Sequence, residues 1–161
     1  MQKRIFSLLM LLWCIVSLNS VYAANEAHVG DRVAYSGGTL TRVYMNGEKA
    51  SGQAVKAFVT KTSEHTYTIE LQEFKAGKMP GTIQVIAKDV SVSADGSFNM
   101  PSMQNIIVLK LFVLFTTKSS FNADLSGAIT SDGRLTFTVT SVNAKYFGIP
   151  FKAIVTFKGH Q

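Results

Sequence analysis

The clearest structural signal in the sequence is the stretch Leu125-Ser126-Gly127-Ala128-Ile129-Thr130-Ser131-Asp132-Gly133-Arg134-Leu135-Thr136-Phe137-Thr138-Val139. Apolar residues alternate with small or polar ones on both sides of its centre. Alternation of period two is typical of a strand with one buried face, and Asp-Gly supplies the positive φ angles of a tight turn. The stretch therefore predicts a β-hairpin whose core-facing residues are Leu125, Ile129, Leu135, Phe137 and Val139.

Most of the remaining chain follows the same design of short amphipathic strands joined by turns. Gly37-Gly38 interrupts the strand predicted over 32–45, which indicates a bulge or a sharp bend of the kind that turns a corner in a barrel. A change of alternation at Asp89 indicates another bulge, within the strand predicted over 82–92. Further strands are predicted over 53–61, 66–74, 106–117 and 151–158, with turns at Asn46-Gly47, Ser63-Glu64-His65 and Asp95-Gly96.

Two segments lack a regular strand pattern. We expect 98–105 to be irregular, because Pro101 cannot donate a ladder hydrogen bond and is excluded from central strand positions. We expect 141–150 to be a loop. The fold class is therefore all-β, with about eight antiparallel strands paired in sequence order. An up-and-down barrel would hide one face of this sheet and remove its exposed edges, and a two-sheet sandwich is the alternative.

The first 23 residues have the layout of a secretory signal peptide. Lys3 and Arg4 precede an apolar run over 5–16, and Val21 and Ala23 stand at the small-residue positions of a cleavage site after Ala23. The apolar run is shorter than the roughly 20 residues that a spanning helix needs. We therefore expect a signal peptide over 1–23, a single barrel domain over 24–161 and no transmembrane segment after cleavage.

Cysteine usage and charge narrow the function classes. Cys14 lies within the apolar run and is the sole cysteine, so we expect the exported portion to have no disulfide and no thiolate chemistry. Removal of Lys3 and Arg4 lowers the formal net charge from +6 to +4, and the remaining lysines are scattered along the sequence. Because a nucleic-acid site would show a basic stripe with interleaved aromatic residues, we expect no nucleic-acid partner.

Several landmarks follow one another in a characteristic order, namely Tyr35-Ser36-Gly37-Gly38-Thr39-Leu40 ahead of Asn46-Gly47, Tyr67-Thr68-Ile69-Glu70-Leu71 ending at Phe74, Gly81-Thr82-Ile83, and the hairpin from Leu125 to Phe137. In this order the chain resembles the calycin-like (lipocalin-like) β-barrel domains exported by Bacteroidetes. The resemblance spans nearly all of 24–161. It implies an eight-stranded barrel that is exported from a Gram-negative cell and is periplasmic, associated with the outer membrane or secreted. It brings no catalytic residues.

The titratable residues form no catalytic or metal-binding pattern. His28, His65 and His160 lie far apart, and none has a second histidine, a cysteine or a carboxylate at metal-ligand spacing. A glycosidase would need two carboxylates facing each other across a cleft, and the carboxylates here are few and scattered. There is neither a Gly-rich phosphate loop nor a Gly-x-Ser-x-Gly elbow. We therefore expect no enzymatic activity, no cofactor and no metal.

The interior of an eight-stranded barrel is either filled by side chains or holds one small ligand. Both alternatives remain open from the sequence. Our leading hypothesis is a non-enzymatic barrel that binds a small hydrophobic or amphipathic ligand in its interior. The residues predicted to line that interior are Tyr35, Leu40, Tyr67, Ile69, Leu71, Leu109, Leu111, Phe137 and Phe151.

The run Ile106–Phe115 is apolar on both faces, unlike the other strands. Its outward set includes Lys110 but also Val108, Phe112 and Leu114. At ~25 cal/mol per Å2, leaving such side chains in water forgoes substantial stabilisation, so something should cover them. One interpretation is internal cover by 98–103 or by the loop 141–150. The other is an interaction module that uses Val108, Phe112 and Leu114 to contact a protein partner, a second copy, a membrane surface or a lipidic ligand.

Overall fold

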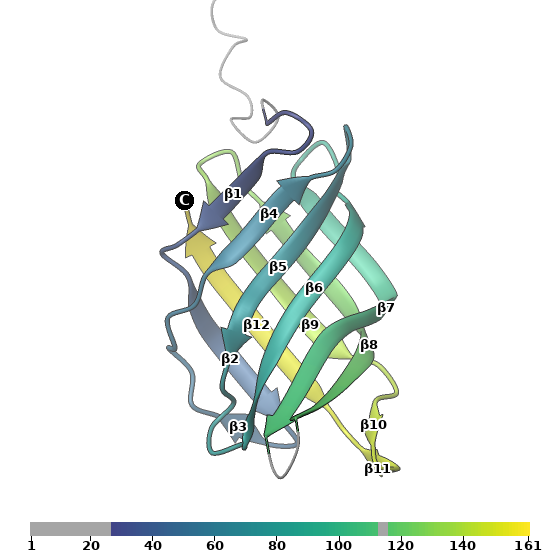
Figure 1. Cartoon of the computed structure of the whole chain (residues 1–161). Coiled ribbons are helices and arrows are strands. Elements are labelled where there is room, and N and C mark those ends of the chain that lie inside the picture. Colours follow the sequence, from purple (N-terminus) through teal and green to yellow (C-terminus); the bar gives the residue numbers. More distant parts are fainter. Residues whose placement is uncertain (1–26, 113–115) are drawn as a thin grey trace, which may run out of the picture.

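The computed structural model describes residues 27–112 and 116–161, and the predicted signal peptide over 1–23 lies outside them. These residues form strands and no α-helix (Figure 1). No helix among them is long and apolar enough to cross a membrane. The strands are β1 (Arg32–Tyr35), β2 (Thr39–Met45), β3 (Glu48–Lys49), β4 (Ala57–Lys61), β5 (Thr66–Phe74), β6 (Gly81–Ser91), β7 (Ser97–Phe112), β8 (Thr116–Ile129), β9 (Arg134–Ser141), β10 (Lys145–Tyr146), β11 (Ile149–Pro150) and β12 (Ala153–His160).

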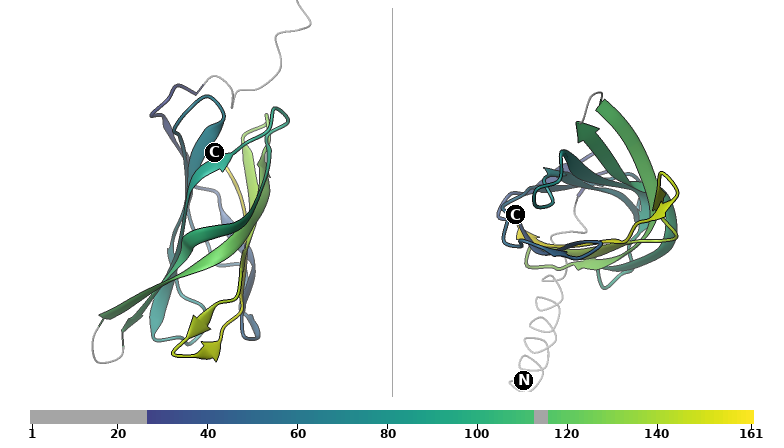
Figure 2. Two further views of the ribbon diagram at one scale, coloured as in Figure 1. Left: turned by 90° about the vertical axis from the view of Figure 1, so that its right-hand side faces the viewer. Right: turned by 90° about the horizontal axis from the view of Figure 1, so that it is seen from below.

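Ten strands form one antiparallel sheet in the order β1-β4-β5-β6-β7-β8-β9-β12-β2-β3. The sheet curls round on itself, and the view from below in Figure 2 shows the strands as a ring. From β4 to β9 each strand pairs with the next one in the sequence, so the chain runs up and down the wall. β10 and β11 form a separate small hairpin. The predicted all-β antiparallel barrel is confirmed, and the sandwich alternative is wrong.

The barrel closes through the bend that the paired glycines predicted. β1 pairs with β4 and β2 pairs with β12, while Ser36-Gly37-Gly38 joins β1 directly to β2. The two margins of the sheet are thus held by two halves of one bent strand. Backbone bonds from Leu40 N–H to Gln53 C=O (3.0 Å) and from Val55 N–H to Gly38 C=O (3.1 Å) add to this seam. With β1 and β2 counted as one strand, eight strands go round the barrel.

The hairpin predicted over 125–139 is present as β8 and β9, and its five predicted core residues are all buried. The turn between the strands contains Gly133 at φ 76°. The bulge predicted at Asp89 is also present. The register between β5 and β6 shifts between Tyr67 and Ile69, and Asp89 has a φ of 54°. Local alternation and glycine placement therefore predicted these features correctly.

Two predicted irregular segments are more regular than expected. Residues 98–105 belong to β7, with register shifts on either side of Met103. The extra residues bulge outward, and the bulge is stabilised by β8: Ser102 N–H donates to Asp124 Oδ1 (2.8 Å), and Asn105 N–H donates to Asn122 Oδ1 (3.0 Å). A bulge is a place where a strand tolerates proline. The predicted loop 141–150 likewise contains the β10–β11 hairpin.

Alternate connections of an up-and-down barrel lie at the same end. The lower end in Figure 1 carries the β2–β3 turn, the β5–β6 loop, the end of β7, the start of β8 and the β10–β11 hairpin. The upper end carries the start of β1, the other turns between neighbouring strands and the C-terminus. The two ends differ in how the interior is filled.

Aromatic side chains fill the upper interior. Phe137 and Phe157 stack with ring centroids 5.2 Å apart, and both are fully buried. The Phe157 ring also occupies the space above Gly38 and Gly159, where a Cβ would lie within 2.2 Å and 2.6 Å of ring atoms. Tyr35 is 2% exposed, and its hydroxyl oxygen accepts a hydrogen bond from Gln161 Nε2 (3.4 Å). This end of the barrel is therefore packed with side chains.

Candidate functional site

Most of the residues predicted to line a ligand site in the interior belong to the packed core. Tyr35, Leu40, Tyr67, Ile69, Leu71, Leu109 and Phe137 are buried, and Leu111 and Phe151 are partly buried against the same core. Among these nine residues, Phe151 borders a hollow at the lower end. The alternation of the strands thus predicted that these side chains are buried, but it did not distinguish the packed region from the open one.

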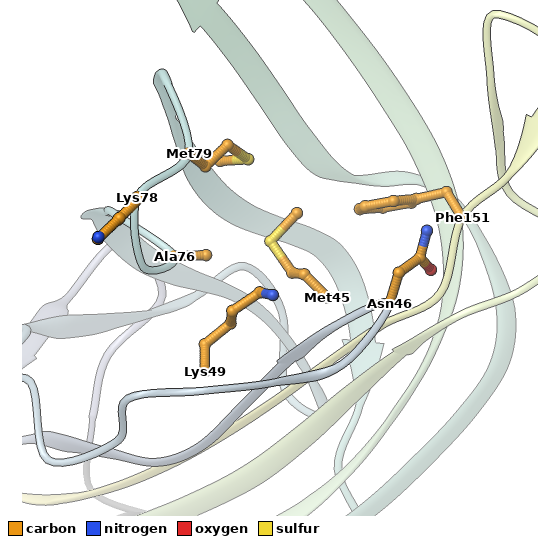
Figure 3. A pocket seen from close by; sticks show the side chains of 7 residues that line it. All are labelled: Met45, Asn46, Lys49, Ala76, Lys78, Met79 and Phe151. Atoms are coloured by element: carbon orange, nitrogen blue, oxygen red, sulfur yellow. The ribbon is translucent and has the colours of Figure 1, made fainter.

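A hollow of about 580 Å3 opens at the lower end of the barrel. Its apolar wall comes from Met45 at the end of β2, Ala76 and Met79 in the β5–β6 loop, and Phe151 just before β12 (Figure 3). Asn46, Lys49 and Lys78 complete its lining. We call these seven residues the mouth hollow. Its apolar wall is continuous with the barrel core, since Met45 and Ala76 belong to the buried cluster and Met79 and Phe151 pack against it.

The β5–β6 loop folds inward over the mouth. Met79 N–H donates to Ala76 C=O (3.4 Å), and Gly77 between them adopts a φ of 62°, which favours glycine. This turn buries Ala76 to 1% exposure although it lies in a loop. The mouth is therefore lined by a small side chain and by two methionines. Methionine is flexible and adapts to irregular apolar surfaces.

The opposite wall is held by the β2–β3 turn. The Asn46 side chain accepts a hydrogen bond from Lys152 N–H at Oδ1 (2.7 Å) and donates from Nδ2 to Pro150 C=O (3.3 Å). These two bonds flank Phe151 and fix its backbone beside Met45. The Phe151 ring also packs on Phe121, with centroids 5.1 Å apart. The Asn-Gly turn signal was visible in the sequence, but its partners on the segment 150–152 were not.

A separate hollow of about 540 Å3 lies where β6 and β7 separate. The paired residues of the two strands run from Gly81–Leu111 to Val85–Ile107, and beyond that point β7 bulges. The hollow is bordered by Ile86, Lys88, Asp89, Met100, Met103, Gln104, Asn105, Ile106 and Val108. We call it the side hollow. Its position in the wall, between two strands, distinguishes it from the mouth.

The predicted partner surface is not an open apolar patch at Val108. Val108 faces outward beside Gln84 and Ser120, yet it is only 6% exposed. Met100 and Met103, from the segment 98–103 that was predicted as one possible cover, border the same hollow as Val108. The Phe112 side chain and Leu114 lie outside the described residues. The alternative cover by 141–150 is not observed for Phe147 and Ile149, which are 83% and 67% exposed.

Few ionisable groups of the described residues have a perturbed pKa. No group of three His, Cys, Asp or Glu residues within 27–112 and 116–161 could hold a metal ion. Burial raises the pKa of the Tyr35 and Tyr67 hydroxyls, which keeps both in the neutral form. The pKa of Asp132 is lowered chiefly by the hydrogen bond from the Thr130 hydroxyl, within an exposed turn. These shifts are explained by the packing of the core and by turn formation.

The lower end of the barrel is basic. Its lysines are distant in the sequence, but the antiparallel connectivity brings them to the same end. The upper end instead carries four carboxylates, in the segment before β1 and in the turns between strands, namely those of Asp31, Glu64, Asp95 and Asp132. Within the described part of the chain, none of the following lower-end lysines has an ion-pair partner: Lys49, Lys75, Lys78, Lys118, Lys145 and Lys152.

Comparison with known proteins agrees with this architecture. The family model of the calycin-like beta-barrel domain matches residues 34–160, which include all of β2 to β12. Neither the curated proteins nor the solved structures gave a match. The matched range covers the seam, the packed upper interior and the mouth hollow. The chain therefore belongs to the calycin-like β-barrel domain family.

Proposed function

We propose that this protein is an exported, non-enzymatic barrel that binds a small hydrophobic or amphipathic molecule at its lower mouth. The observation that carries the proposal is the mouth hollow, an apolar recess continuous with the core. Ligand sites in proteins are commonly concave, largely apolar and furnished with a few polar groups. The proposal moves the predicted site from the centre of the barrel to one end, because aromatic side chains occupy the upper interior.

Two methionines give a matched test of this location. Met79 borders the mouth hollow and Met103 borders the side hollow, and both are partly buried against the core. Replacement by glutamine keeps the length of the side chain and removes its apolar end. We expect Met79→Gln to weaken binding of the neutral fluorophore phenylnaphthylamine about fivefold, since about 1 kcal/mol of apolar contact is lost. Met103→Gln should leave that affinity unchanged.

The measurement is a fluorescence titration of each purified variant, with far-ultraviolet circular dichroism to verify that the fold is retained. An affinity that falls with Met103→Gln and not with Met79→Gln would place binding at the side hollow and contradict the proposal. A parent protein that does not bind the fluorophore at all would contradict it as well.

A further inference from the structure

Two of the three polar residues that line the mouth hollow are cations. Lys49 and Lys78 belong to its lining, and neither has an ion-pair partner among the described residues. In Figure 3 the Lys49 ammonium group lies on the side of Ala76 and Met45, whereas the Lys78 side chain extends away from the hollow at its outer rim. The Lys49 stem passes over the β5–β6 loop, where a Cβ on Gly77 would lie 3.4 Å from Lys49 Cδ. An ammonium group therefore stands next to the apolar wall.

The other polar groups near the mouth are already engaged. The Asn46 amide is bonded to the backbone of Lys152 and Pro150. Glu48 pairs with Arg42 at 2.7 Å, and Glu73 pairs with Lys110. The carboxylates closest in sequence to Lys49 and to the β5–β6 loop thus have cations of their own. The charge at the mouth is left positive.

The surroundings extend this positive charge beyond the hollow. Lys75, Lys118, Lys145 and Lys152 lie at the same end of the barrel, while unpaired lower-end carboxylates are lacking among the described residues. Charge of one sign around a recess raises the local concentration of ligands of the opposite sign. Both the hollow and its rim therefore favour an anion.

We infer that the mouth hollow takes a single-chain amphiphile with an anionic head, of the carboxylate or phosphate type. The alkyl chain lies along Met45, Ala76, Met79 and Phe151, and the head lies at Lys49, with Lys78 contributing from the rim. This inference rests on the proposed function and specifies the ligand class of the same site. Burial of the chain supplies affinity, and the ammonium groups select the head.

The test compares three amphiphiles that share one chain: decanoate, decanol and decyltrimethylammonium. Each competes with phenylnaphthylamine for the purified protein at low ionic strength. We expect decanoate to bind about tenfold more tightly than decanol, which corresponds to about 1.4 kcal/mol, and the cation to bind most weakly. Lys49→Gln should remove most of this preference, Lys78→Gln a smaller part, and added salt should reduce it because exposed charges are screened.

Lys158→Gln is the matched control, since Lys158 is an exposed lysine towards the other end, on β12. The preference for decanoate should persist in it. Equal affinity for decanoate and decanol, or a preference that Lys49→Gln leaves intact, would overturn the inference while the proposed function stands. If none of the three displaces the fluorophore, the proposed function fails together with it.

A further experiment, cosedimentation with lipid vesicles, distinguishes two sources of the anionic head group. Cosedimentation with phosphatidylglycerol vesicles that decanoate abolishes would mean that the mouth takes the head from a bilayer. Stoichiometric binding of decanoate without cosedimentation would mean that the ligand is a free amphiphile. Both results support the anionic class. Cosedimentation that decanoate does not affect, with no binding of decanoate itself, would overturn it.

Discussion

Replacement of Gly38 by alanine tests the seam that closes the barrel. Gly38 is buried, and its φ lies outside the left-handed region, so alanine introduces no backbone strain there. The added methyl group would lie 2.2 Å from Phe157 Cε2 and 2.6 Å from the Val55 carbonyl oxygen. The ring cannot move away easily, because it stacks on Phe137 and abuts Gly159. The clash therefore acts on both the core and the seam.

Overpacking a core costs about 1–3 kcal/mol, and we expect the upper part of this range because the methyl group meets a held ring and a backbone oxygen. For a domain of this size, the loss corresponds to a decrease in the melting temperature of about 10 °C. The neighbouring Gly37 gives a matched control. A Cβ there would meet the imidazole of His160, an exposed side chain that can rotate, so Gly37→Ala should cost less than about 1 kcal/mol.

The assay is urea unfolding followed by circular dichroism, because Trp13 is the sole tryptophan and lies in the predicted signal peptide. Both variants lose one glycine, so the change in unfolded-state entropy is similar in the two and cancels in their difference. If Gly37→Ala and Gly38→Ala have equal free energies of unfolding, the seam is not packed as described and the reasoning is refuted.

Two further predictions concern the buried tyrosines and the bulge in β7. Burial raises the pKa of the Tyr35 and Tyr67 hydroxyls, so these groups lose their protons at a lower pH in the unfolded chain than in the folded protein. The free energy of unfolding should therefore stay level up to about pH 10 and fall above it. Unfolding titrations across this range should show a smaller fall in the double variant Tyr35→Phe, Tyr67→Phe, and an identical fall would contradict the assignment. Asp124→Ala removes the acceptor for Ser102 N–H and should lower the free energy of unfolding by about 1 kcal/mol in the same assay. Ser126→Ala, at an exposed position of the same strand, should have no effect, and equal losses in the two variants would show that the bulge does not depend on Asp124.

The sequence was sufficient to predict the features that depend on local pattern. The hairpin over 125–139 follows from its alternation and its Asp-Gly turn, and the bend at Gly37-Gly38 follows from paired glycines within a strand. In a strand with one buried face, a slip of one residue would move every side chain to the other face, so the pairing register is strongly specified. The barrel itself follows from eight such segments in succession, since closure removes the exposed edges.

The features that the sequence did not predict depend on partners that are distant in the chain. Pro101 lies within β7 because Asp124 and Asn122 of β8 accept hydrogen bonds from the backbone of the bulge. No sequence pattern near Pro101 indicates these two contacts. The mouth hollow lies at the lower end because the stacked rings of Phe137 and Phe157 fill the upper interior. The basic lower end exists because alternate connections of the barrel meet there, although its lysines are scattered along the sequence.

The binding site at the mouth hollow is tested most directly by the methyl NMR spectrum of the methionines during titration with decanoate. Residues 24–161 contain four methionines, since Met1 and Met10 belong to the predicted signal peptide. Met45 and Met79 border the mouth hollow, and Met100 and Met103 border the side hollow. We predict that the methyl signals of Met45 and Met79 shift with saturation while those of Met100 and Met103 remain in place. Shifts confined to Met100 and Met103, or no shift in any of the four, would contradict a binding site at the mouth.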